Sequence, residues 1–187
     1  MVTAQLGRSS LLVSLLASLL CVLLFGGVLV AGPGSDNGRR NVRETLEGYQ
    51  EVPAVSTTGV AEFRARIDEE GEMITWRLSY ADLEGDVAQS HIHFGQAGVN
   101  GGISVFLCTN LGNGPAGTQP CPPSPATIEG FITPADVIGP AGQGISAGEL
   151  EELVRAIRAR STYVNVHTSL FPGGEVRGQI APPARNR

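Results

Sequence analysis

The chain has three histidines, all in segments with the pattern of strands, and imidazoles that converge could hold a metal ion. His91 and His93 are two residues apart in QSHIHF, and His167 closes the segment TYVNVH. Side chains two apart in a β-strand project from the same face, so His91 and His93 lie on one face if QSHIHF is a strand. Imidazole nitrogens are good copper and zinc ligands. We therefore predict that His91, His93 and His167 converge at one rim of the domain, with copper or zinc as the candidate cofactor.

Two interpretations of these histidines are open. In the first they bind a metal ion, and in the second they hydrogen-bond to loop backbone and to neighbouring strands without a metal. Strands routinely place polar residues on exposed faces, which favours the second interpretation. Catalytic alternatives have less support, because the sequence has no G-x-S-x-G motif and no distinctive pair of acidic residues. No catalytic residue is predicted.

A second polar motif follows the third histidine. Asn165 shares a strand face with that histidine, and the turn residues 172–174 (PGG) lead into another strand. Glu175, Arg177 and Gln179 alternate along this strand and therefore share one of its faces. We expect Arg177 to pair with a carboxylate and close the hairpin; the alternative is that it guides an anion to the site.

The cysteines bear on the compartment. Cys108 and Cys121 bracket the segment TNLGNGPAGTQP, which has no apolar pattern of its own. A disulfide closing such a loop stabilises a fold by about 3 kcal/mol. Two free thiols would be expected in a reducing cytosol, so the prediction of a disulfide depends on export. Cys21 lies in the apolar N-terminal segment and has no predicted role.

Residues 1–31 are predicted to be a signal peptide or a transmembrane anchor. The segment 11–31 is almost entirely apolar, and 21 residues in a helix span about 31 Å, enough to cross a bilayer. Secretory signals have shorter apolar regions and an Ala-x-Ala-like cleavage site, whereas the candidates here are Gly32 and Gly34. Both interpretations lead to export, either as a membrane-anchored protein or as a secreted, periplasmic or cell-surface protein. Residues 32–43 (GPGSDNGRRNVR) are predicted to be a linker.

The elements that must position the histidines are strands. In VAEFRARI (60–67) apolar and polar residues alternate, and a similar run follows the turn DEEG (68–71), which predicts a β-hairpin. Further strands are expected around Tyr49–Ala54, Ala88–Phe94, Ile103–Cys108, Thr127–Ile132, Thr162–Thr168 and Glu175–Ile180. Eight short strands predict an all-β fold, an antiparallel sandwich or barrel.

One helix interrupts the strands, near residues 149–160. Leu150, Leu153 and Ile157 have helical spacing, and Ser146 and Glu149 have the spacing of a capping box. The helix is expected to pack across an open end of the sandwich; the alternative is that it binds a partner.

Composition excludes a nucleic-acid function. The chain has 13 basic residues, all of them Arg, against 18 acidic residues, a net charge of −5. Scattered arginines on an acidic chain bind a phosphate backbone poorly. The 25 Gly and 12 Pro suit a turn-rich β protein.

The chain contains the segments HIHFGQAGVNGGISVFLC, FITPADVIGPAGQGI and YVNVHTSLFPGGEVRGQI. Together they resemble the CHRD domain, a module first described in chordin and widespread in exported bacterial proteins. The resemblance implies an immunoglobulin-like or superoxide-dismutase-like Greek-key sandwich over residues 44–181, with a tail at 182–187. The histidine pattern is also similar to the copper ligands of Cu,Zn superoxide dismutase, without the fourth histidine and the zinc loop.

The expected function is a non-catalytic structural or binding role at the cell surface. The partners would be the membrane, through the N-terminal segment, and an extracellular protein or ligand that the sequence does not identify. The alternative is a metalloprotein that binds copper or zinc through His91, His93 and His167, and a dismutase-like redox enzyme ranks last.

Overall fold

The computed structural model describes residues 40–181. The predicted N-terminal signal or anchor, most of the predicted linker and the tail lie outside these residues. Within 40–181, no helix is long and apolar enough to span a membrane. The strands are β1 (Asn41–Glu47), β2 (Val60–Ile67), β3 (Ile74–Ala81), β4 (Val87–Phe94), β5 (Gly102–Thr109), β6 (Ala126–Ile132), β7 (Thr162–Thr168) and β8 (Val176–Ile180).

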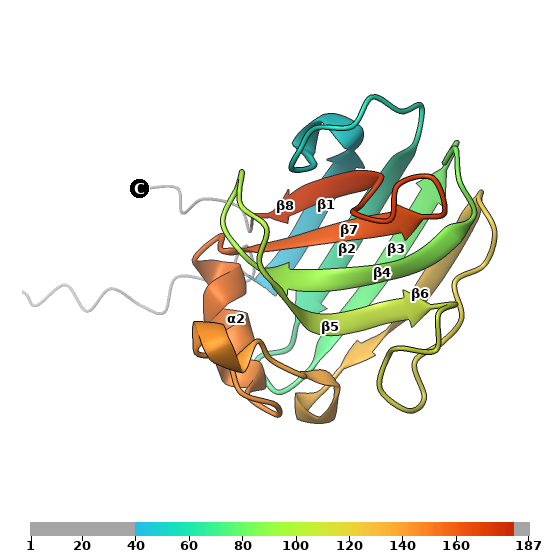
Figure 1. Ribbon diagram of the computed structural model, residues 1–187. Helices are drawn as coiled ribbons and strands as arrows, with labels where there is room; N and C mark the ends of the chain where they lie inside the picture. The colour runs from blue at the N-terminus through green and yellow to red at the C-terminus, as the bar shows by residue number, and fades with distance from the viewer. Residues whose placement is uncertain (1–39, 182–187) are drawn as a thin grey trace, which may run out of the picture. The chain divides into compact units, whose positions relative to one another are not determined.

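All strand pairs are antiparallel, in the order β5-β4-β7-β8-β1-β2-β3-β6. In Figure 1, β5, β4, β7 and β8 form the near layer, and β1, β2, β3 and β6 cross behind them. The layers are joined where Glu47 of β1 pairs with Arg177 of β8. The eight strands therefore make a sandwich that is nearly a closed barrel, which confirms the predicted all-β fold class.

Alternating apolar residues fill the space between the layers. On β2 and β3 the predicted hairpin is present, and Phe63 pairs with Leu78 in its register. Both side chains are buried, as are Ile92 on β4 and Val164 and Val166 on β7. The opposite face of β4 and β7 is therefore the one that carries the histidines.

The predicted strand at Tyr49–Ala54 is wrong. The first strand is β1, which begins inside the segment predicted to be the linker, and it is followed by the 3₁₀ helix η1 (Gly48–Gln50). The chain folds back at Gly48, whose carbonyl accepts hydrogen bonds from the amides of Glu51 and Val55. A side chain at Gly48 would overlap the Val55 carbonyl, so this close approach requires glycine.

The predicted helix is α2 (Leu150–Arg158), and it lies at one end of the sheets (Figure 1). Its apolar residues Leu150, Leu153, Val154 and Ile157 are buried in the common core, as expected for a packing helix. The capping box is only half formed: Glu149 accepts from the Ser146 amide, but Glu149 itself is the N-cap and has no side-chain cap. The half-formed box closes the turn that precedes the helix.

The predicted disulfide between Cys108 and Cys121 is confirmed. It joins β5 to the Gly- and Pro-rich segment that leads to β6. Asn110 also fastens this segment: its side chain donates to the carbonyls of Val87 and Cys121 and accepts from the Cys121 amide.

Candidate metal centre

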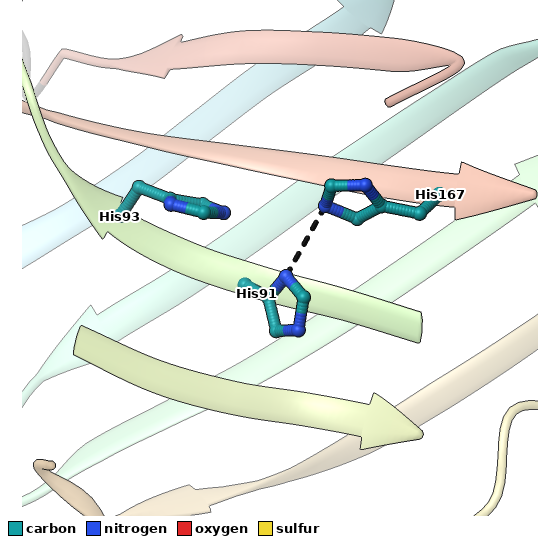
Figure 2. A group of neighbouring side chains, drawn as sticks. All are labelled: His91, His93 and His167. Atoms are coloured by element: carbon teal, nitrogen blue, oxygen red, sulfur yellow. Dashed lines mark hydrogen bonds between the residues drawn. The ribbon is translucent and has the colours of Figure 1, made fainter. Parts of the chain in front are cut away.

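The three histidines come from two neighbouring strands, as Figure 2 shows. His91 and His93 belong to β4 and His167 belongs to β7, which pairs with β4. Because Ile92 and Val166 point into the core, the three imidazoles project from the outer face of this layer. The structure thus brings together all three predicted ligands, on a sheet face rather than at a rim.

The strand register places Asn165 at the centre of this cluster. Asn165 pairs with His91 across the β4–β7 ladder, and the next pair on the same face is His93 with Tyr163. His167 follows Asn165 by two residues on the same face. One nitrogen from each histidine lies within 4.8 Å of one from each of the others.

The cluster is buried, although it lies outside the core. His91 is 1% exposed, and His93 and His167 are each 7% exposed. Two segments that cover the cluster are hydrogen-bonded to it. Residues 95–101 and the loop after β7 each supply a carbonyl to a histidine. The segment after β1 joins them, because Asn100 donates to the Val52 carbonyl. The site is therefore shielded from water by three loops.

Backbone carbonyls fix two of the imidazoles in one tautomer. Nδ1 of His93 lies 2.9 Å from the Gly101 oxygen, and Nδ1 of His167 lies 2.9 Å from the Pro172 oxygen. A carbonyl only accepts, so both Nδ1 atoms carry the proton and both neutral rings keep a lone pair on Nε2. Metal-binding histidines are typically held in this way, with the distal N–H donated to a carbonyl.

The third histidine completes a short nitrogen–nitrogen contact. Nδ1 of His91 lies 3.2 Å from Nε2 of His167. Two nitrogens bound to one tetrahedral ion at about 2.0–2.1 Å are about 3.3–3.4 Å apart, close to this separation. The two histidine nitrogens that are farthest apart lie within 4.8 Å of each other. Binding one ion would therefore bring them closer by up to about 1.4 Å. Nε2 of His91 and of His93 are buried without a hydrogen-bond partner.

Burial keeps the imidazoles neutral. Desolvation lowers the pKa of His91 to about 2 and that of His93 to about 4, with repulsion between the histidines adding to both shifts. Desolvation also lowers the pKa of His167, against the hydrogen bond to Pro172. Metal ions bind the neutral form of imidazole, so these three side chains are in the protonation state that a cation requires.

Arg177 supports the cluster and does not pair with a carboxylate as predicted. Its guanidinium lies 3.4 Å from the centroid of the Tyr163 ring, and that ring stacks on His93 with centroids 4.6 Å apart. Arg177 is 1% exposed and donates to the Val99 carbonyl at 2.8 Å, to the Gln96 carbonyl and to the Asn100 side chain. The covering loop supplies these acceptors, and no ion pair of Arg177 is found among residues 40–181.

The other two residues of the polar motif hold loops. Glu175 precedes β8 and accepts hydrogen bonds from the hydroxyls of Thr57 and Thr168 and from the Glu84 amide, each at 2.7 Å. Gln179 donates to the carbonyls of Gly95 and Arg160. Both residues therefore fasten the segments around the site.

Sequence reasoning missed Glu51, which lies in the covering segment after β1. Its side chain is 6% exposed, and burial raises its pKa to about 7 against the charge of Arg177 and a hydrogen-bond interaction with Asn165. Its Oε1 atom is buried without a partner. The residue pattern predicts a strand here, so nothing in it sets this carboxylate apart from surface acids.

The fold and the site define a class of protein: an antiparallel β-sandwich with a buried cluster of histidines under loops on one outer face. The CHRD domain profile matches residues 42–180, and the chain belongs to this family. This confirms the expected family. No curated protein and no solved structure gives a match.

Proposed function

We propose that this CHRD-domain protein is an exported, non-catalytic binding protein whose ligand is a single copper or zinc ion held by His91, His93 and His167. One observation carries the proposal: three buried, neutral imidazoles from two strands bring one ring nitrogen each to within 4.8 Å of the others. In the absence of a cation, Nε2 of His93 is buried without a hydrogen-bond partner. A divalent ion at the cluster would bind the lone pair of this nitrogen and remove that cost.

Copper and zinc suit this donor set better than other metals. Imidazole is a good ligand for both, and the site offers no thiolate because Cys108 and Cys121 form a disulfide. A dismutase-like redox activity has less support, because all three histidines of the chain are in this one cluster and none is left for a second metal.

Metal titration tests the proposal directly. We expect the full chain, purified in detergent and stripped of metal, to bind about one equivalent of Zn²⁺ or Cu²⁺. His93→Ala or His167→Ala should abolish this binding. Leu153→Ala is the control, since it destabilises the fold by about 2–5 kcal/mol in the helix, away from the histidines, and should leave the stoichiometry unchanged. Binding that survives both histidine substitutions would refute the proposal.

Export is supported by the disulfide, because such bonds persist in oxidising compartments. The membrane, through the N-terminal segment, and an extracellular protein or ligand are the proposed partners. N-terminal sequencing of the mature protein distinguishes a cleaved signal peptide from a retained anchor. A start at Pro33 or Ser35 indicates a removed signal peptide, and an intact N-terminus indicates an anchor. Two free cysteines in protein from its native compartment would contradict export.

A further inference from the structure

Asn165 lies at the centre of the histidine cluster, and its side-chain oxygen faces the imidazole of His167. Oδ1 of Asn165 lies 3.1 Å from Nε2 of His167. The Asn165 side chain also interacts with the imidazole of His93, and the residue pairs with His91 across the ladder. Asn165 is 2% exposed, so its side chain lies out of contact with bulk water.

The contact between Asn165 and His167 joins two acceptors. Nδ1 of His167 donates to Pro172, so Nε2 of the neutral ring carries a lone pair. The amide oxygen also carries lone pairs, and an oxygen and a nitrogen that both lack hydrogen repel at 3.1 Å. Turning the amide over would replace this repulsion with a hydrogen bond, so something must hold it in the present orientation.

The Glu51 carboxylate supplies that constraint. The Asn165 side chain interacts with this carboxyl and lowers its pKa, and only a donor does so, which means that the amide NH₂ group faces Glu51. With its NH₂ turned to Glu51, Asn165 must present its oxygen to the histidines. Glu51 is itself held in place, because it is buried and packs against the backbone of Gly174.

We propose that Asn165 is the fourth ligand of the metal site, binding through Oδ1, and that Glu51 is the positioning residue that turns this oxygen toward the ion. The inference rests on the proposed function. Three imidazole nitrogens and one amide oxygen complete a four-coordinate set suited to Zn²⁺. The Glu51 carboxylate acts through Asn165 and does not bind the ion itself. It places a negative charge near a site whose ligands are neutral.

Four forms of the full chain test this inference, with Zn²⁺ alone as the probe and a chromophoric chelator as competitor. Asn165→Leu preserves size and removes the oxygen, and it should weaken zinc binding at least about 10-fold. Glu51→Gln should weaken it about 10–100-fold, as the loss of a group that orients a metal ligand does. The double variant Glu51→Gln with Asn165→Asp exchanges the two groups, so that the amide is at position 51 and the carboxylate at position 165. The amide can then donate to the carboxylate, and an oxygen at position 165 still faces the metal. We expect the double variant to recover affinity to within about threefold of the wild type, a non-additive rescue.

The outcomes separate the two proposals. Wild-type affinity in Asn165→Leu, or no rescue in the double variant, would show that Asn165 is only structural and would overturn this inference while the three-histidine site stands. A wild-type protein that binds no Zn²⁺ would overturn both proposals. Thermal unfolding of the metal-free variants identifies any that fail to fold; if Asn165→Leu is one, the Glu51→Gln loss and its rescue decide the question.

Discussion

Acidification should destabilise the metal-free protein through its buried histidines. Burial lowers the pKa of His91 to about 2 and that of His93 to about 4, whereas both titrate near 6.5 in the unfolded chain. Between these values the unfolded state binds more protons, so stability that is present above about pH 6.5 is lost as the pH falls toward the folded-state pKa. From pH 7 to pH 5, His91 and His93 should each remove about 2 kcal/mol from the free energy of unfolding.

Glu51 should act in the opposite direction. Burial raises its pKa to about 7 from an ordinary value of 4.5, so the folded state takes up a proton between pH 7 and pH 5 while the unfolded carboxyl stays ionised. This uptake should add about 2 kcal/mol to stability at pH 5 relative to pH 7. The net loss is then about 2 kcal/mol, and His167, whose pKa burial also lowers, should increase it.

Urea unfolding with a chelator present, at pH 7, 6 and 5, measures this loss. Glu51→Gln is the informative variant, because a glutamine cannot take up the proton that offsets one histidine. We expect the loss between pH 7 and pH 5 to grow from about 2 to about 4 kcal/mol in this variant. Equal stability at pH 7 and pH 5 in the wild type, or a smaller loss in Glu51→Gln, would refute the account of neutral buried imidazoles.

Three further changes probe the supports of the site. Replacing Cys108 and Cys121 by Ala should lower stability by about 3 kcal/mol for a separation of 13 residues, measured by urea unfolding; a loss below about 1 kcal/mol would contradict the loop-closure reasoning. Arg177→Lys should cost about 2–4 kcal/mol in the same assay, because lysine lacks the planar fork that stacks and donates to the loop. Gly174→Ala, at a φ of 128°, would overlap the Glu51 carboxylate; it should lower the thermal midpoint and weaken zinc binding, and an unchanged midpoint would refute this contact.

The sequence predicted the histidine faces well because strand alternation is a local property. In QSHIHF and TYVNVHT the period of two alone determines which side chains share a face. The pairing of β4 with β7 is not local, since the two strands are about 70 residues apart and meet only through the sheet order. Convergence of the three rings could therefore be proposed from the sequence, but the strand order that produces it is visible only in the folded chain.

The sequence failed where backbone geometry decides the outcome. The partners of Arg177 are largely loop carbonyls, which every residue type supplies, so no pattern of side chains identifies them. For a related reason, the sequence did not single out Glu51. Its segment turns back at Gly48 through a close backbone approach, although the residue pattern of Tyr49–Ala54 predicts a strand. Both residues belong to the loops that cover the site or contact them, where periodicity carries no information.

The burial of the histidines bears on what the site can do. Catalytic metal sites keep a coordination position open to substrate, whereas structural and binding sites close it with a fourth protein ligand. Here no histidine is more than 7% exposed, and Arg177 anchors the covering loop through three hydrogen-bond acceptors. With Asn165 as the fourth ligand, no position would be left for a substrate. Under the proposed function, this closed cluster would therefore favour retention of an ion over turnover.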